Sequence, residues 1–508
     1  MSTRGIRIVG GQVLTLDGNA GLIDDGEVIV DGDTIAYVGP QRPAGPGETG
    51  YSTLNAHGSL VLPGLVNGHT HSYGVFAKGG VDGMPLDLFV PAVTALGEAL
   101  RDEEDLYLAA ALTAAEALRS GTTCLLDHLR YPYRLGCQAF EAAARGYLDA
   151  GVRATIAPMF GDRPFEDTLP QTGSRPAIAR AESPGDADAY LAACAQAVPR
   201  LHGARGRMQF FLGTDGPQRC TPYLLRRSRE FLDAYPVGMQ SHVYETATQR
   251  VRGGQLYGTS LVAVLEDFGL LGPGLSLVHF VWPDGDDLQR VRRAGATVVH
   301  CPGANLQLGS GIAPVPEMTE MGIPVALGTD GANSLDLSLW TQIRLAALLH
   351  RVTHPWYRSW LTSAAVLRMA TCGGAAAHRL SGQIGVLRAG AKGDVILLDP
   401  RASAVAAGRD PAVNLVMRET GASVHTVLVG GEIVVRDGQC VRIDEGDLLA
   451  RLGRRAEQLR PEVERRQEEM RSRYGPSVEA MYQEVMSSLG DDTRFSGPAS
   501  CRRTPTAN

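Results

Sequence analysis

The sequence predicts an α/β protein with a (β/α)8, TIM-like barrel and a small β-sandwich domain built from both termini. The middle of the chain alternates short apolar runs with alanine-rich segments of helical periodicity, a pattern typical of a parallel sheet. Both ends instead alternate apolar and polar residues between Gly and Asp, which is typical of hairpins. The 508 residues provide enough chain for a barrel and a second domain.

The β domain is expected from residues 1–61 together with residues 384–444. Val28 to Val38 alternates in the first part, and Val424 to Val435 alternates in the second. The pair Gly430–Gly431 indicates a hairpin turn. Since the two parts flank a long α/β middle, we expect them to join in one composite domain.

The barrel is expected from residues 62–383. Asp102 to Leu118 is alanine-rich and has apolar residues at helical spacing. Ser120 begins a turn that leads into a strand-like run ending at Asp127 and His128. Repeated strand–helix units of this kind predict a parallel sheet, and the length of the segment fits eight of them.

The last part of the chain has a different composition. Residues 445–489 are rich in Arg, Glu and Leu and predict a helical segment with a solvated charged face. Residues 490–508 are polar, with Gly, Pro, Ser and Thr, and predict a disordered tail.

Composition and charge exclude several classes of function. The formal charge of −7 is spread along the chain and no basic stripe occurs, so we expect no nucleic-acid partner. We find no apolar core of a signal peptide and no span for a bilayer, so we expect no membrane association. The eight cysteines are scattered, which favours reduced thiols and a cytoplasmic location.

Polar residues capable of binding metal stand where apolar, strand-like runs stop. His69 and His71 follow the first such run, and residues two apart on a strand point to the same side. His242, His279 and Asp330 stand at the ends of later runs. Two histidines beside a turn would be unremarkable, but four such strand ends in order favour a metal site. Nitrogen and oxygen ligands suit zinc or iron.

With these residues the chain resembles the amidohydrolase superfamily, and more closely its branch of cytosine deaminase-like, S-adenosylhomocysteine deaminase and chlorotriazine hydrolase (ATZ/TRZ) enzymes. The resemblance covers nearly the whole chain except its last few dozen residues. Four motifs carry it: Pro63-Gly-Leu-Val-Asn-Gly-His69-Thr-His71, His242-Val-Tyr-Glu245-Thr246, His300-Cys-Pro-Gly-Ala-Asn305 with its continuation to Gly311, and Leu327-Gly-Thr-Asp330-Gly-Ala-Asn-Ser334.

The resemblance implies one divalent metal ion, zinc in the first place and iron in the second. Its implied ligands are His69, His71, His242 and Asp330. No lysine stands out as a bridging ligand, so a two-metal centre is not expected. A bound ion of this kind lowers the pKa of a water to about 7.

Three residues are implied in catalysis. Glu245 is expected to deliver a proton to the ring nitrogen and the leaving amine, since burial can raise the pKa of a carboxyl group; a solvated surface glutamate is the alternative. Asp330 is expected to accept the proton of the attacking water. His279 ligates the metal weakly, orients water or substrate, or is a buried structural histidine.

Candidate substrate contacts come from other strand ends. Many relatives carry a Pro-His-Ala-Pro-Tyr-like segment where this chain has Gly216-Pro-Gln-Arg219, so their contacts there cannot be transferred. The loop from Val81 to Val90 resembles a family segment and is expected to cover the site; Met84, Leu86 and Phe89 form an apolar wall or simply pack. Asn305 and Ser334 contact substrate or brace loops. The candidate substrate-binding residues are His128, Arg130, Gln218, Asn305 and Ser334.

We therefore expect a metal-dependent hydrolytic deaminase that acts on a small nitrogen heterocycle of pyrimidine, purine, nucleoside or s-triazine type. A hydrolase that displaces another leaving group, chloride or an alkylamine, is the alternative. A third hypothesis is a catalytically silent metal-binding homologue, but the chain keeps every implied ligand and Glu245. By analogy with relatives, we expect a homodimer or homotetramer.

Overall fold

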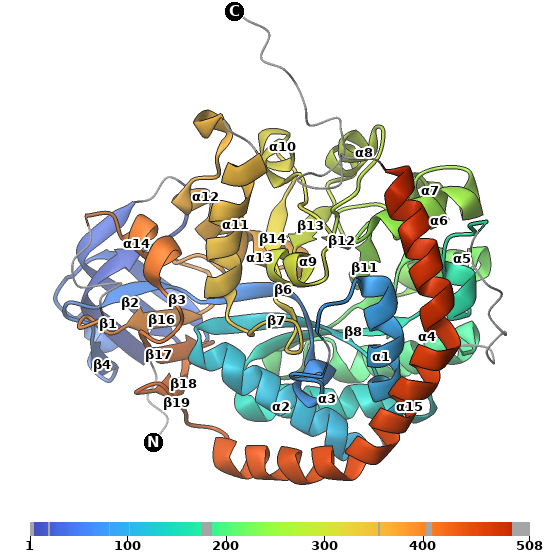
Figure 1. The fold of residues 1–508 in the computed structure, drawn as a ribbon. Coiled ribbons are helices and arrows are strands. Elements are labelled where there is room, and N and C mark those ends of the chain that lie inside the picture. The colour runs from blue at the N-terminus through green and yellow to red at the C-terminus, as the bar shows by residue number, and fades with distance from the viewer. Residues whose placement is uncertain are drawn as a thin grey trace, which may run out of the picture.

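The computed structural model describes residues 5–18, 21–80, 82–100, 102–173, 185–353, 356–402 and 409–489, with the side chains of 92–98 left out. Two sheets organise these residues (Figure 1). One is a parallel sheet surrounded by helices, and the other is a separate mixed sheet built from strands that precede and follow the parallel sheet in the sequence.

The parallel sheet closes on itself. All of its neighbouring strands pair in parallel. The eighth strand is interrupted: its first part pairs with β13, and its second part, two residues later, pairs with β6. The ring is thus complete, as in a (β/α)8 barrel. Its strands are β6 (Leu65–His71), β7 (Thr122–Leu129), β8 (Arg153–Phe160), β9 (Met208–Phe210), β10 (Leu212–Thr214), β11 (Met239–Val243), β12 (Leu275–His279), β13 (Thr297–His300), β14 (Val325–Leu327) and β15 (Asp330–Gly331).

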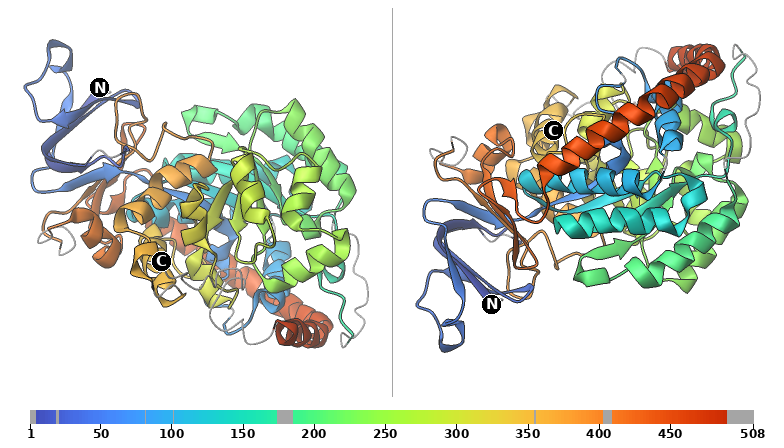
Figure 2. Two further views of the ribbon diagram at one scale, coloured as in Figure 1. Left: turned by 90° about the horizontal axis from the view of Figure 1, so that it is seen from above. Right: turned by 90° about the horizontal axis from the view of Figure 1, so that it is seen from below.

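Helices cover the outside of the barrel (Figure 2). The predicted alanine-rich helix is present, and the Asp102 side chain caps it by accepting from the backbone N–H groups of Glu104 and Asp105. The helices before residue 400 are α1 (Leu86–Ala99), α2 (Glu103–Arg119), α3 (Cys137–Ala150), α4 (Ala187–Leu201), α5 (Pro222–Ala234), α6 (Ala247–Tyr257), α7 (Leu261–Asp267), α8 (Asp287–Ala294), α9 (Pro302–Gln307), α10 (Val315–Glu320), α11 (Leu339–Thr353), α12 (Ser363–Arg368) and α13 (Gly374–Ala377).

The mixed sheet joins the two ends of the chain. Strand β5 pairs with β1 on one side and, antiparallel, with β16 on the other. Gly430 and Gly431 both have positive φ and form the predicted hairpin turn between β17 and β18. The strands are β1 (Gly5–Leu14), β2 (Leu22–Asp31), β3 (Thr34–Pro40), β4 (Ser52–Asn55), β5 (Leu60–Pro63), β16 (Val395–Leu398), β17 (Val424–Val429), β18 (Glu432–Arg436) and β19 (Gln439–Cys440).

Two helices follow the barrel. The shorter, α14 (Pro411–Arg418), precedes β17, and the longer, α15 (Glu445–Ser488), ends the described chain. Helix α15 changes direction along its length and then runs beside α1 (Figure 1). Pro461 and Pro476 lie inside it, and proline removes a backbone hydrogen bond and bends a helix.

The predicted fold class is confirmed: a TIM-like barrel with a sheet built from both termini. The domain limits at residues 62, 384 and 445 stay a prediction. The tail predicted to be disordered, residues 490–508, lies outside the described residues. Among the described helices, none is long and apolar enough to cross a membrane.

A buried ion pair links the barrel to the mixed sheet, at the end of the barrel where its strands begin. Arg153, the first residue of β8, donates from Nε and Nη2 to the two oxygens of Asp394, at 2.7 and 3.0 Å. The side chains are 5% and 1% exposed. Asp394 also accepts from the backbone N–H of Gly430. Burial of two charges is tolerated here because each has several partners.

Asp394→Ala should lower the free energy of unfolding by about 3–5 kcal/mol, because it leaves the Arg153 guanidinium buried without its partner. Urea titration of the two proteins measures the difference. The double variant Arg153→Met/Asp394→Leu, which buries no charge, should recover most of the loss. A single variant within about 1 kcal/mol of the parent would contradict this role.

The matched control is an exposed pair in the same region. Arg401 is 87% exposed and pairs with Asp399. Arg401→Ala should change the free energy of unfolding by less than about 1 kcal/mol, as exposed pairs do.

Candidate metal centre and active site

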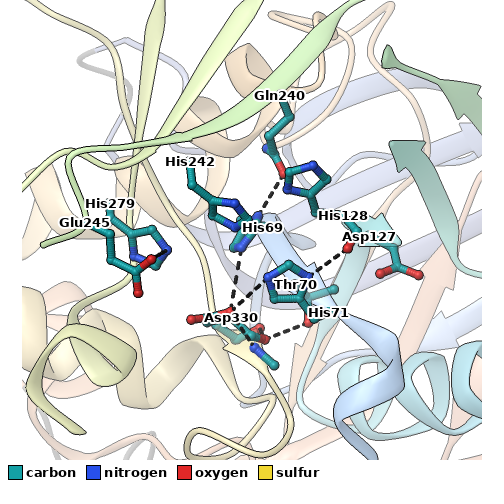
Figure 3. A network of polar contacts seen from close by, with 12 residues as sticks. His69, Thr70, His71, Asp127, His128, Gln240, His242, Glu245, His279 and Asp330 are labelled. Carbon is teal, nitrogen blue, oxygen red and sulfur yellow. Dashed lines mark hydrogen bonds and ion pairs between the residues drawn. The ribbon is translucent and has the colours of Figure 1, made fainter. Parts of the chain in front are cut away.

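Side chains from four strands meet at the end of the barrel where its strands finish (Figure 3). His69 and His71 come from β6, His242 from β11, His279 from the end of β12 and Asp330 from β15. The Nε2 atoms of His69 and His71 lie 3.7 and 3.4 Å from Asp330 Oδ1. Parallel strands bring their carboxyl ends to one rim, so residues 260 positions apart become neighbours.

The two histidines of β6 are each held by a hydrogen bond at Nδ1. His71 Nδ1 donates to the backbone carbonyl of His128 at 2.7 Å. His69 Nδ1 is 2.8 Å from Gln240 Oε1, and Gln240 in turn donates from Nε2 to the Gly68 carbonyl. Because the amide nitrogen of Gln240 donates to Gly68, the amide oxygen is the atom that faces His69. Both imidazoles therefore carry their proton on Nδ1 and leave the Nε2 lone pair free.

The histidines of β11 and β12 are held in the same way. His242 Nδ1 donates to the backbone carbonyl of Asp215 at 2.6 Å. His279 Nδ1 donates to Asn305 Oδ1 at 2.9 Å. This pattern, in which Nδ1 is occupied by an acceptor and Nε2 is available, is typical of metal-ligating histidines.

These residues fit a divalent metal ion. Potential ligand atoms of His69, His242 and His279 lie within 4.8 Å of one another, and so do those of His69, His71 and Asp330. His69 Nε2 is buried and has no hydrogen-bond partner in the described structure. Burial lowers the pKa of His71 well below its usual range and that of His279 to about 3, so both rings are neutral. A buried orphan lone pair among neutral imidazoles and a carboxylate is the donor set of a metal site.

Asp330 is buried yet ionised. Burial alone favours its neutral form, but the neighbouring His69, His71 and His279 hold its pKa below the ordinary value. Its Oδ1 accepts from the backbone N–H of Gly331, and its backbone carbonyl accepts from the Thr70 hydroxyl at 2.8 Å. These bonds hold the residue in place at the rim, with Oδ1 beside the two histidines of β6.

Glu245 follows β11 and lies beside the cluster without belonging to β11 itself. Its Oε2 is 3.5 Å from His279 Nε2, and its backbone N–H donates to Gln249 Oε1 at 2.9 Å. Burial, followed by the negative charge of Asp330, raises the pKa of Glu245 well above its ordinary value. The carboxyl group therefore retains a proton more readily than a solvated glutamate.

Backbone strain gathers at the same rim. Tyr244, His279, Phe280 and Asp330 all have positive φ although none is glycine. Each such residue costs about 1–3 kcal/mol and persists only where the surrounding structure fixes it. The turns that aim His279, Glu245 and Asp330 into the cleft are thus held by packing and not by local preference.

A cleft of about 560 Å³ opens onto the cluster. That volume includes solvent at the open mouth of the cleft. Of the predicted substrate-binding residues, Arg130 and Ser334 line it, whereas His128, Gln218 and Asn305 are buried and are not among its lining residues. Among the loop residues, Leu86 and Phe89 line it and Met84 does not. Substrate contact by each residue stays a prediction.

Sequence reasoning missed Asp215 as a lining residue, and Arg219, a secondary candidate at this strand end, is not among the predicted substrate-binding residues. The two form an ion pair at 2.7 Å within the cleft wall. A signal was present: Leu-Gly-Thr-Asp-Gly occurs twice, and it places Asp215 directly after β10 and Asp330 in the second part of the eighth strand. Gln240 and Gln249 were missed too, and nothing in their local sequence marks them.

Fold and site together define a barrel hydrolase with a His/Asp metal site. Residues 60–434 match the family described as the amidohydrolase family. The chain belongs to the amidohydrolase family, and the predicted resemblance is confirmed. The protein is accordingly an enzyme that acts on carbon–nitrogen bonds other than peptide bonds.

Similar proteins of known name extend over most of the chain. It is 32% identical to a 5′-deoxyadenosine deaminase from Methanopyrus kandleri over 89% of this chain and 99% of that protein. It is 31% identical to a 5-methylthioadenosine/S-adenosylhomocysteine deaminase from Pelotomaculum thermopropionicum, over 89% of this chain and 98% of that protein.

Solved structures share the fold. A zinc-bound adenosine deaminase from Xanthomonas campestris superposes with a TM-score of 0.78 at 24% identity, covering 90% of this chain and 98% of that one. A zinc-bound atrazine chlorohydrolase from Arthrobacter aurescens gives 0.79 at 24% identity, covering 89% and 100%. At this identity the likeness establishes the barrel and its terminal sheet only.

Gln240→Ala should weaken metal binding about 10–100-fold, because His69 Nδ1–H loses its acceptor and the ring is no longer fixed. The measurement is metal bound per chain after dialysis against a graded series of chelator concentrations. Gln209→Ala, on β9 at the start of a barrel strand, is the matched control and should release metal like the parent. His69→Ala should retain almost none. Equal release by the Gln240 and Gln209 variants would contradict the positioning role.

Proposed function

We propose that this protein is a metal-dependent hydrolytic deaminase that removes the 6-amino group of adenosine-type nucleosides as ammonia. The observation that carries the proposal is the buried His/Asp cluster with the buried Glu245 carboxyl beside it, 3.5 Å from His279. The substrate class is supported by the near full-length similarity to deaminases named for 5′-deoxyadenosine, 5-methylthioadenosine and S-adenosylhomocysteine.

The proposed ligands are His69, His71, His242 and Asp330, with His279 close enough to contribute. Zinc is the proposed ion, and iron is the second candidate. Bound there, the ion would act as a Lewis acid and lower the pKa of a water to about 7. The remaining chemistry belongs to the side chains around it.

Glu245 is placed to move protons. Deamination of an adenine ring requires a proton on the ring nitrogen before water adds, and another on the departing amine. Glu245, whose pKa burial raises, would deliver the first proton. The ionised Asp330 across the cluster would accept a proton from water, and that proton would pass to the departing amine. His279, 3.5 Å from Glu245 and fixed by Asn305, orients the groups between them.

The cleft suits a flat base with a polar appendage. Leu86, Phe89 and Leu308 provide apolar lining, and Arg219, Gln249 and Ser334 provide polar groups. An aromatic and aliphatic wall stabilises a heterocycle by burial, while a few polar groups fix its orientation.

The direct test is ammonia release from 5′-deoxyadenosine, 5-methylthioadenosine and S-adenosylhomocysteine by purified enzyme of measured metal content. We expect release from at least one nucleoside. Chlorinated and alkylamino s-triazines form the second arm, with chloride and alkylamine as readouts. Turnover confined to that arm would replace deamination by displacement of another leaving group. No turnover in either arm by fully metallated protein would favour a silent homologue.

Glu245→Gln should reduce kcat by about 10²–10⁴-fold, the range for a positioned general acid–base. Glutamine keeps the shape but cannot deliver the proton. Metal content should remain that of the parent, since Glu245 is not a proposed ligand. Both quantities are measured on the same preparation.

The control for losing a buried carboxylate is Glu419→Gln. Glu419 is 1% exposed and accepts from three backbone N–H groups of its own loop before β17. That variant should keep kcat within about twofold of the parent. Near-normal kcat in metallated Glu245→Gln would remove Glu245 from the mechanism.

Two further expectations remain proposals. A homodimer or homotetramer would be detected by light scattering on the full chain. The cytoplasmic location rests on composition alone.

A further inference from the structure

Helix α1 lies between two cavities and lines both of them. Leu86, Phe89 and Val90 line the cleft that holds the metal cluster. Leu88 and Pro91 line a second cavity on the other side, of about 800 Å³. At 100° per residue these two sets lie on opposite faces of the helix. Whatever moves α1 toward the second cavity therefore enlarges the cleft.

The far side of the second cavity is α15. Met470, Tyr474 and Gly475 line it from that helix. Farther along, Val478, Met481 and Val485 form a buried apolar cluster with Tyr474, and Leu88 of α1 packs against it. The two helices run side by side (Figure 1).

The first half of α15 is tied elsewhere. Arg455 donates to Asp105 and Asp102 at the start of α2, at 2.6 and 2.7 Å. Helix α15 begins at Glu445, beyond the family match that ends at residue 434. Helix α15, which packs on α1, thus lies outside the family match, and its first half is bonded to the start of α2.

The first turn of α1 is hydrogen bonded to the first turn of α6, which begins two residues after Glu245. Thr248 donates its hydroxyl to Asp87, with oxygen distances of 2.8 and 3.0 Å, and lies 2.6 Å from the Thr246 hydroxyl. Pro91 has no N–H to return to Asp87, so the helix loses a hydrogen bond one turn later. Helix α1 is thus held by side-chain hydrogen bonds at its start and lacks one backbone hydrogen bond at Pro91, where it faces the second cavity.

We propose that the second cavity and α15 set the size of the substituent that the cleft accepts. Packed interiors resist a change of even one methylene, whereas a void behind a wall lets it retreat. A nucleoside with a long 5′ substituent would displace α1 toward α15, and a small one would not. The choice of substrates rests on the proposed function.

The test fills the cavity from α15. A Cβ at Gly475 would meet only Arg471 Cγ, at 3.9 Å, so a side chain can be accommodated. Gly475→Leu should lower kcat/KM for S-adenosylhomocysteine at least tenfold relative to 5′-deoxyadenosine. The matched control is Gly453→Leu in the same helix, where a Cβ meets nothing within 4 Å and the cavity is not adjacent. It should leave that ratio within twofold of the parent.

A second variant acts in the opposite direction. Leu88→Ala enlarges the cavity and should raise the same ratio in favour of S-adenosylhomocysteine. Metal content should be unchanged in every variant. If Gly475→Leu does not fold, the Leu88 result decides. A ratio within twofold of the parent in the folded variants would overturn the proposal. Helix α15 would then have only a structural role, packing on α1.

A readout without turnover separates this proposal from the proposed function. Backbone amide exchange in α1 should slow in Gly475→Leu, quicken in Leu88→Ala and stay unchanged in Gly453→Leu. If the parent deaminates none of the nucleosides, the proposed function fails, and exchange in α1 still decides whether the cavity governs its movement. Unchanged exchange in both cavity variants would overturn the proposal.

Discussion

The site depends on four imidazoles that share one tautomer. Each has its Nδ1 hydrogen bonded to an oxygen, and each turns its Nε2 toward a common point. Two of the oxygens are backbone carbonyls and two are side-chain amides. Every acceptor lies on a different strand or loop from the ring that it fixes, so the closed barrel is what makes the rings converge. A histidine placed correctly in the sequence but lacking its acceptor would rotate.

Much of this arrangement could be predicted from the sequence. His69 and His71 are two apart at the end of an apolar run, and the strand period places both on one face. The succession of strand ends at His242, His279 and Asp330 predicts the barrel rim. These inferences succeed because each rests on local periodicity and on the single geometry that parallel strands allow.

The rest depends on contacts between distant segments. The carbonyls of His128 and Asp215 that fix two of the rings have no side-chain signature. Gln240 stands in an ordinary apolar strand, and only the closed ring brings its amide to His69. The packing of α15 on α1 joins segments almost 400 residues apart, and the sequence of neither helix indicates which element it packs against. The repeated Leu-Gly-Thr-Asp-Gly marks Asp215 as a residue at a strand end, but not the contact of its carbonyl with His242.

The interrupted eighth strand has a consequence for biosynthesis. Strand β6 begins at Leu65 and is synthesised early. Strand β15, which closes the ring against it, begins only at Asp330. At about 5–20 residues per second, β6 waits roughly a quarter of a minute to a minute for its second neighbour. During that interval one edge of an apolar parallel sheet is open, and contacts this distant in sequence form slowly. The nascent chain is therefore most exposed to misassociation before its last barrel strand is made.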